Sequence, residues 1–255
     1  MDPETVIRTR NLRKSFGETV VLEGVDLDIH RGESIAIIGR SGVGKSVLLK
    51  HVLGLLQPTE GDVWCLGIRV NGASLAELHE IRSRAGYVFQ FAALFDSLNI
   101  RENVGFFLDN HTDTPPDEVD RIVDEKLAQV GLPETAHLMP AELSGGMKKR
   151  AGLARALVGE PQIILYDEPT SGLDPITAAA INDLINETKD LTRATTVIIT
   201  HDMASAYKTA DRIAMLHEGR IIFDGTAEEV RATENPYVQQ FIQGRARGPI
   251  NPLFK

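Results

Sequence analysis

The stretch GRSGVGKS at residues 39–46 constrains the fold of this chain more than any other feature. It matches the spacing G-x-x-x-x-G-K-[ST] without a mismatch. An apolar segment that predicts a strand (residues 34–38) precedes it, and a segment with apolar residues at helical spacing (residues 45–56) follows it. Glycines let the backbone curl so that successive N–H groups point inward, and the helix start adds the positive end of its dipole. The pattern therefore predicts a phosphate-binding loop.

We expect this loop to bind the phosphates of a nucleotide. The Lys45 ammonium would reach the terminal phosphates, and the Ser46 hydroxyl would bind Mg²⁺. The residues expected to contact the nucleotide are those of the loop and of the helix start: Gly39, Arg40, Ser41, Gly42, Val43, Gly44, Lys45, Ser46 and Val47.

Composition limits the class of protein. The 255 residues are enough for one large domain, or for a core with a smaller subdomain. With 42% hydrophobic and 25% charged residues the chain is an ordinary globular sequence, and a net charge of −9 makes nucleic acid a poor partner. Cys65 is the single cysteine, so no internal disulfide forms. No run of about 18 apolar residues occurs, so a membrane role requires partner subunits.

Hydrophobic periodicity predicts strands alternating with helices, which is typical of an α/β fold with a mainly parallel sheet. We expect short strands at residues 5–10, 20–22, 25–29 and 34–38, and a strand or hairpin arm at 61–70. Residues 99–155 are mainly helical, with one apolar stripe from Val119 to Val130 ended by Gly131. Strands at 162–166 and 195–200 flank a helix at 176–189. A hairpin at 213–223, a C-terminal helix and an irregular tail follow.

Asp167 and Glu168 follow an apolar strand directly. Two adjacent carboxylates at the end of a buried strand are electrostatically costly unless a cation or a proton shares the site. We expect Asp167 to hold Mg²⁺, directly or through water, and Glu168 to act as general base on the attacking water. Solvated acids at a strand end are the simpler alternative.

A third small-residue motif lies between these two. Ser144, Gly145 and Gly146 precede a predicted helix and offer backbone N–H groups to an anion. A Ser-Gly-Gly turn by itself is usually only a helix start. Its position between two nucleotide motifs makes it a candidate anion site.

In combination, these motifs resemble those of the ABC-type ATPase subunits, the nucleotide-binding domains of ABC transporters, along nearly the whole chain. The resemblance implies a role for each matching residue. Phe16 would stack on adenine, Gln90 would bind Mg²⁺ and sense the γ-phosphate, and His201 would hydrogen-bond that phosphate. Ser144, Gly145, Gly146 and Asp174 would contact the ATP of a partner subunit. Phe16 as a strand-end aromatic, Gln90 as a surface glutamine and His201 as a strand-end histidine are the simpler alternatives.

The resemblance also implies the architecture. It is a P-loop NTPase of ABC type, with a mostly parallel core sheet, an antiparallel β subdomain and an inserted helical subdomain. Residues 1–90 and 160–243 would form the ATP-binding core with the N-terminal antiparallel part. Residues 91–159 would form the helical subdomain with the signature motif, and residues 244–255 the C-terminal tail.

The resemblance further implies a homodimer that closes on two ATP molecules. The phosphate loop and the acid pair bind one side of ATP, and the signature motif of a second copy would cover the other. Contacts that exist only with the γ-phosphate present are lost on hydrolysis, so nucleotide state drives closing and opening. Moving such an equilibrium from 1:99 to 99:1 takes about 5.5 kcal/mol of differential binding.

Three segments resemble one branch of the family more than the others. Met147 stands where most members have glutamine, and LSGGMKKRA is similar to the ATPase subunits of Mla/Mce-type lipid transport systems. Residues 89–104 and the C-terminal tail are similar to theirs as well. This implies phospholipid transport by a complex with integral-membrane permease subunits, to which lipid-binding and small regulatory subunits can add. The chain would lie on the cytoplasmic face of a bacterial inner membrane, with its tail reaching the neighbouring ATPase subunit.

Three alternatives stay open. One is the ATPase of an importer for a small polar solute such as an amino acid. Another is a non-transport ABC ATPase of the iron–sulfur assembly type, which can be this short. The third is a module that binds ATP without turnover, against which the presence of Lys45, Glu168 and His201 argues.

Overall fold

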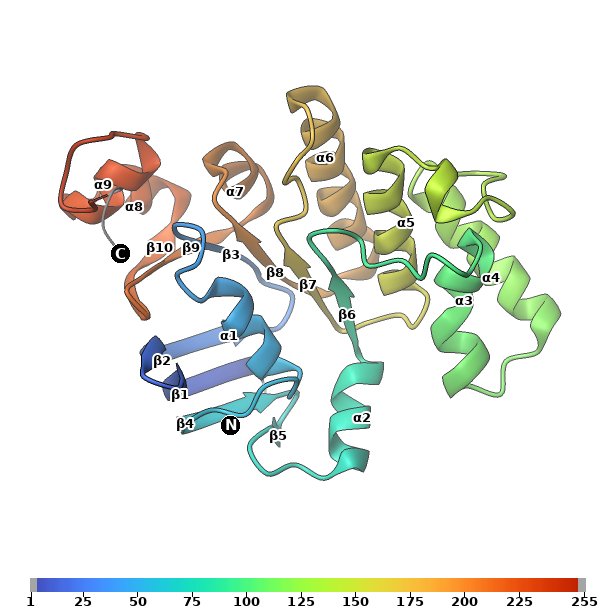
Figure 1. The fold of residues 1–255 in the computed structure, drawn as a ribbon, viewed down its shortest axis with the longest axis horizontal. Helices are drawn as coiled ribbons and strands as arrows, with labels where there is room; N and C mark the ends of the chain where they lie inside the picture. Colours follow the sequence, from blue (N-terminus) through green and yellow to red (C-terminus); the bar gives the residue numbers. More distant parts are fainter. Residues whose placement is uncertain (1–3, 252–255) are drawn as a thin grey trace. The chain divides into compact units, whose positions relative to one another are not determined.

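The computed structural model describes residues 4–251, which fold as two compact units. The first unit combines the chain up to Ala73 with the chain from Ile198 onward, and the second is Ser74–Val197. The boundary falls inside strand β8 (Thr195–Thr200), so each unit holds half of that strand (Figure 1). The predicted division into residues 1–90 with 160–243, 91–159 and 244–255 stays a prediction.

An antiparallel sheet of order β2-β1-β4-β5 lies in the first unit. Its strands are β1 (Thr5–Phe16), β2 (Thr19–His30), β4 (Glu60–Cys65) and β5 (Ile68–Arg69). The prediction of separate strands at 20–22 and 25–29 is wrong, because β2 continues through Gly24. With φ 92°, Gly24 lies at a register shift between the pairs Leu12–Val25 and Arg13–Glu23. A bulge therefore absorbs the residue that looked like a strand break.

The first unit also contains the strand that carries the phosphate loop. Here β3 (Ser34–Ile38) is buried at every residue and pairs in parallel with β9 (Arg212–His217). The latter pairs antiparallel with β10 (Arg220–Thr226), as the predicted hairpin requires. The helices are α1 (Lys45–Val52), α7 (Met203–Thr209), α8 (Ala227–Ala232) and α9 (Pro236–Ile242). Two short helices thus replace the single C-terminal helix predicted, and α1 ends four residues before the predicted end at residue 56.

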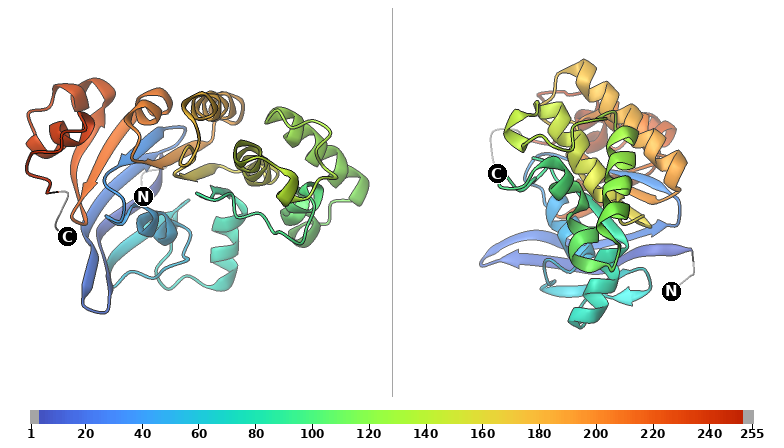
Figure 2. Two further views of the ribbon diagram at one scale, coloured as in Figure 1. Left: turned by 45° about the horizontal axis from the view of Figure 1, so that its top comes forward. Right: turned by 90° about the vertical axis from the view of Figure 1, so that its right-hand side faces the viewer.

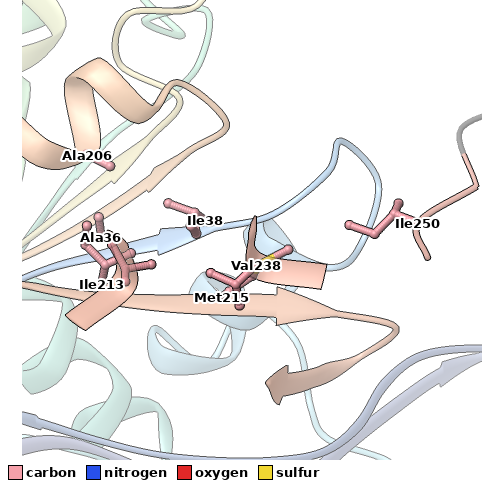
Figure 3. Close-up of a cluster of buried hydrophobic side chains, with 8 residues drawn as sticks. Ala36, Ile38, Ala206, Ile213, Met215, Val238 and Ile250 are labelled. Atoms are coloured by element: carbon pink, nitrogen blue, oxygen red, sulfur yellow. The ribbon is translucent and has the colours of Figure 1, made fainter. Parts of the chain in front are cut away.

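A hydrophobic cluster joins these elements at the end of β3. Figure 3 shows side chains from β3, β9, α7 and α9 together with one from the tail. All are almost completely buried, and they include Ile38, the residue directly before the phosphate loop. The cluster consists of Ala36, Ile38, Ala206, Ile213, Met215, Val230, Val238 and Ile250.

The irregular tail is anchored to this unit through Gln240 of α9. The buried Gln240 amide accepts from the Ile250 N–H at 2.7 Å and donates to the Ile250 carbonyl at 2.8 Å. A Cβ on Gly248 would lie 2.4 Å from the Gln240 Cδ, so the close approach requires glycine. Residues 244–251 thus pack on their own chain, and the contact of the tail with a neighbouring subunit stays a prediction.

The second unit is a parallel strand pair with five helices. Strand β6 (Ala85–Val88) pairs in parallel with β7 (Ile163–Asp167), and the first half of β8 lies on the other side of β7. The helices are α2 (Leu75–Ser83), α3 (Ile100–His111), α4 (Pro116–Gln129), α5 (Gly145–Leu157) and α6 (Pro175–Thr192). Helices α3, α4 and α5 pack together (Figure 2).

Local sequence explains where these helices begin. Ser74 and Glu77 form a capping box at α2, and Asn99 with Glu102 forms one at α3. Helix α4 begins at Pro116, as predicted from its two prolines, and Gly131 lies just beyond its end with φ 68°. The short 3₁₀ turn Pro140–Glu142 leads into α5.

Replacing Ile250 by alanine tests the anchoring of the tail. Ile250→Ala removes buried methyl and methylene groups from the cluster, so we expect the free energy of unfolding to fall by about 2 kcal/mol. Urea unfolding followed by circular dichroism measures this. Pro249→Ala, at an exposed neighbouring position, is the control and should leave the midpoint unchanged. Equal midpoints for both variants would show that the tail is not packed.

Candidate functional site

The phosphate loop is the turn between β3 and α1 in the first unit. Gly39 has φ 151°, and a Cβ there would lie 2.4 Å from the main-chain oxygen of Leu216. Gly44 has φ 104° at the N-cap of α1. Neither conformation suits a side chain, so these two glycines are needed for the turn itself. The shape of the loop therefore depends on glycine at both positions.

The Lys45 side chain is folded into this loop. Only 5% of Lys45 is exposed, and its ammonium donates to the main-chain oxygens of Gly39 at 2.8 Å and Arg40 at 3.0 Å. A cation is therefore already held at the loop, where anionic oxygens are attracted to it. The Arg40 guanidinium points to the tail and donates to the Asn251 carbonyl at 3.1 Å. Among the other residues expected to bind nucleotide, Ser41 and Gly42 are exposed, Gly44 is buried, and Val43, Ser46 and Val47 are half-buried.

Phe16 and His201 also belong to the first unit. Phe16 ends β1, its residue is 49% exposed, and the Lys14 ammonium lies 5.1 Å from the centre of its ring. An exposed aromatic face of this kind can stack on a base. His201 follows the last residue of β8 and is exposed. The carboxylate of the next residue, Asp202, accepts N–H groups at the start of α7.

The acid pair lies at the end of β7 in the second unit. Asp167 is the last residue of the strand, Glu168 follows it, and each is 8% exposed. The Tyr87 hydroxyl donates to Asp167 Oδ2 at 3.0 Å. Burial and the neighbouring Asp167 charge raise the pKa of Tyr87, so its hydroxyl stays a donor. The carboxylates are thus buried, as predicted, and not a solvated strand end.

Gln90 lies near the loop that follows the acid pair. It comes two residues after β6, and its side-chain nitrogen is 3.4 Å from the Ser171 hydroxyl. Within the second unit the structure therefore brings together Gln90, the acid pair and the turn at residues 168–171. Among the described residues, no group of three or more His, Cys, Asp and Glu side chains is placed to hold a metal ion alone.

The four candidate residues for a partner's nucleotide lie at two helix starts, where Ser144 and Asp174 are the N-caps. The Ser144 side chain accepts from the Met147 N–H at the start of α5, and Gly145 and Gly146 form the first turn. Asp174 accepts from the Ile176 and Thr177 N–H groups at the start of α6. Hydrogen bonds from Thr177 lower the pKa of Asp174. The N–H groups of the first turn of α5 are donors that an anion could use, whereas at α6 Pro175 has no N–H and Asp174 takes the next two.

Sequence reasoning missed two polar side chains beside the acid pair. Tyr87 belongs to the segment that drew attention for Gln90, but its contact with Asp167 depends on the parallel pairing of β6 and β7. Lys149 of α5 is buried and donates to the main-chain oxygen of Glu168 at 3.1 Å. The only sequence signal for Lys149 is a cation on the apolar side of a predicted helix.

The exposed phenylalanines of residues 89–95 form a second candidate surface in this unit. Phe91 is 85% exposed, and Phe89 and Phe95 are also exposed. Their backbone is held by the Arg155 guanidinium, which donates to the carbonyls of Ala92 and Ala93 at 2.7 Å each. The buried Asn103 amide holds Phe95 through both its main-chain N–H and its carbonyl. An apolar surface on a fixed backbone is typical of a docking site.

The sequence of this chain is similar to those of several transport ATP-binding proteins. Residues 22–171 match the ABC transporter family. The intermembrane phospholipid transport system ATP-binding protein MlaF of Haemophilus influenzae is 36% identical over 97% of this chain and 94% of its own. The protein TRIGALACTOSYLDIACYLGLYCEROL 3, chloroplastic, of Arabidopsis thaliana is 42% identical over 98% of this chain and 76% of its own. A probable ribonucleotide transport ATP-binding protein mkl of Mycobacterium leprae is 44% identical over 96% and 70%.

Two solved structures have a similar fold. The cbiO1 protein of Clostridium perfringens has a TM-score of 0.82 at 32% identity, over 90% of this chain and 91% of its own. The ATP-binding cassette MJ0796, in a dimeric post-hydrolysis state bound to ADP and Pi, has a TM-score of 0.78 at 34% identity, over 86% and 98%. The predicted fold class is confirmed. In the described part of the chain, no helix is both long and apolar enough to cross a bilayer. The chain belongs to the ABC transporter family and is an ATP-binding subunit of such a transporter.

Proposed function

We propose that this chain hydrolyses ATP to drive phospholipid transport by a membrane complex of the Mla/Mce type. One observation carries the proposal: relatives named as phospholipid transport ATP-binding proteins match nearly the full length of both chains. The residues of a working ATPase are all present, including Lys45, Asp167, Glu168 and His201. Membership of the family indicates that the chain hydrolyses ATP, and the names of the MlaF relatives indicate phospholipid as the transported substrate.

In this proposal the residues from Gly39 to Val47 bind the triphosphate. The Lys45 ammonium exchanges the Gly39 and Arg40 carbonyls for phosphate oxygens, which form stronger, charge-assisted hydrogen bonds. Phe16 stacks on the adenine ring, and His201 donates to the γ-phosphate. These roles follow from the motifs and from the exposure of both side chains.

Glu168 acts as general base in the hydrolysis. Its carboxylate accepts a proton as a water oxygen forms a bond to the γ-phosphorus. The bond from that phosphorus to the β–γ bridging oxygen breaks, and ADP leaves with phosphate as the second product. The low exposure of Glu168 supports this role, because a shielded carboxylate can hold one ordered water away from bulk solvent.

Magnesium fits the side chains proposed to hold it. Mg²⁺ prefers oxygen ligands, which the Asp167 carboxylate, the Ser46 hydroxyl and the Gln90 side-chain oxygen supply. Asp167 is buried and already accepts a hydrogen bond, so its carboxylate is oriented. Because the described residues form no cluster of three or more His, Cys, Asp and Glu side chains, phosphate and water would complete the coordination. The bound ion supplies positive charge to the phosphates.

We expect the working form to be a homodimer. The structures of MJ0796 are dimeric, and the start of α5 in this chain offers N–H groups to the nucleotide of a partner. Ser144, Gly145, Gly146 and Asp174 are the residues proposed for that contact. ATP then holds two copies together, and hydrolysis weakens the dimer.

The complex places the chain at a membrane through other subunits. The exposed phenylalanine surface at residues 89–95 would receive a helix of an integral-membrane permease. Lipid-binding and small regulatory subunits belong to the proposal as further partners. The cytoplasmic face of a bacterial inner membrane is the proposed location.

Removing the ammonium of Lys45 tests the phosphate loop. Because a charge-assisted hydrogen bond is worth about 1.5–3 kcal/mol, Lys45→Ala should lower ATP affinity at least about 10-fold in titration calorimetry. Lys50→Ala, on the exposed side of the same helix, should bind ATP normally. Unchanged affinity in Lys45→Ala would overturn the assignment of the loop.

The base is tested by Glu168→Gln, which keeps the shape of the side chain but cannot accept the proton. Phosphate release should fall by about 100-fold or more while ATP still binds, and light scattering should show the ATP-bound dimer accumulating. Glu187→Gln, an exposed position on α6, serves as the control. Near-normal turnover in Glu168→Gln would remove Glu168 from its role.

Cargo and docking can be tested in one purification from membranes. The chain should retain a permease and phospholipid, identified by mass spectrometry. Phe91→Glu should retain neither the permease nor the phospholipid, because burying a charged side chain in an apolar contact is energetically costly. Leu75→Glu, equally exposed on α2, should lose neither. A retained ribonucleotide or amino acid in place of lipid would contradict the cargo, and full recovery of the permease by Phe91→Glu would contradict the surface.

A further inference from the structure

Glu168 has an unusual backbone conformation for a catalytic glutamate. Its φ is 51°, in the left-handed region that residues with a side chain rarely adopt. Such a conformation persists only where surrounding groups impose it. The direction of the Glu168 side chain depends on this backbone angle, so whatever holds the backbone also aims the carboxylate.

Two donors hold the Glu168 carbonyl. One is the N–H of Ser171, at 3.1 Å, which closes the turn after the strand. The other is the ammonium of Lys149, also at 3.1 Å. The first bond is local to the turn. The second comes from α5, a different element of the same unit, and ties the turn to that helix.

Lys149 is placed for this contact at an electrostatic cost. Only 7% of the residue is exposed, and burial lowers the pKa of its ammonium, while the charges of Glu168 and Asp167 act in the opposite direction. A buried ammonium is stable only when it is paired or hydrogen-bonded. The Glu168 carbonyl supplies that hydrogen bond, and the charges of Glu168 and Asp167 favour the ammonium through space.

The helix that carries Lys149 also carries the signature residues. Gly145 lies four positions earlier and therefore on the same face of α5, one turn toward its start. The first turn of α5 packs against the first turn of α6, since a Cβ on Gly146 would lie 2.8 Å from the Thr177 methyl carbon. A displacement at the start of α5 is thus passed along a rigid element to Lys149.

We propose that Lys149 is a positioning residue that holds Glu168 in its active direction and links this direction to the signature motif on the same helix. This inference rests on the proposed roles of Glu168 as base and of Ser144–Gly146 as contacts to a partner's nucleotide. In each subunit, contact of the signature motif with the partner's ATP would then influence the orientation of that subunit's own Glu168. The hydrogen bond from Nζ is the essential element, so another long cationic donor can replace it.

Turnover and binding separate this role from a purely structural one. Lys149→Met should lower kcat for ATP about 10-fold or more and leave KM within about twofold, because only the aim of the base is lost. Lys149→Arg should restore most of the rate, since its guanidinium can donate to the same carbonyl. Lys148→Met, the adjacent and more exposed lysine, should behave as the unaltered chain.

Hydrogen exchange provides a readout that does not depend on activity. Without the Lys149 bond the turn at residues 168–171 loosens, so its amides should exchange faster in Lys149→Met and not in Lys148→Met. Normal kcat in Lys149→Met overturns the inference, and unchanged exchange in that variant does so as well. If Lys149→Met does not fold, Lys149→Gln, whose shorter side chain cannot reach as far, is measured in the same two ways with the same expected results.

The two proposals fail in different ways. Normal turnover in Glu168→Gln overturns Glu168 as base and with it the catalytic part of this inference. Normal turnover in Lys149→Met beside an inactive Glu168→Gln overturns the Lys149 role alone.

Discussion

Two adjacent carboxylates at the buried end of β7 impose the strongest requirement in the second unit. Asp167 and Glu168 are each 8% exposed, and like charges so close repel each other strongly when shielded from water. Two other elements place hydrogen-bond donors there. The Tyr87 hydroxyl of β6 donates to the Asp167 carboxylate, and the Lys149 ammonium of α5 donates to the Glu168 carbonyl. Strand pairing and helix packing are thus arranged around the electrostatics of one strand end.

The first unit meets the opposite requirement, which is to hold a cation within the phosphate loop. Glycines at positions 39 and 44 allow the turn, and Lys45 is kept in place by two carbonyls of the same loop. Those bonds are weaker than bonds to phosphate oxygens, so a triphosphate can replace them. The hydrophobic cluster beneath, with Ile38 and the tail residue Ile250, supports the strand from which the loop emerges.

A transport ATPase must also pass motion to other subunits, and the surface proposed for docking, residues 89–95, has a backbone fixed by hydrogen bonds. Arg155 and Asn103 hold residues 92–95 by side-chain hydrogen bonds to the main chain. The backbone that carries the phenylalanines is therefore held in place, so a displacement of a partner helix in contact with them would be transmitted to this unit. Lys149 would serve the same purpose at the catalytic end of α5.

The start of α5 was predicted in advance, since the Ser-Gly-Gly turn is a local signal, and capping boxes mark the starts of α2 and α3 in the same local way. The extent of β2 was not, because Gly24 looks like a break until β1 pairs across it and the bulge absorbs it. The tail was read as irregular, which it is, but its anchoring through Gln240 joins residues that no short pattern connects.

By itself the sequence determined the phosphate loop, the acid pair and the order of the motifs, because each is a short contiguous segment whose chemistry follows from residue type and spacing. Only the tertiary structure decided that Tyr87 meets Asp167, that Lys149 meets the Glu168 carbonyl and that Ile250 fills the cluster at the end of β3. Those contacts join residues 19 to about 210 positions apart, so they depend on strand register and helix packing, which local sequence does not encode.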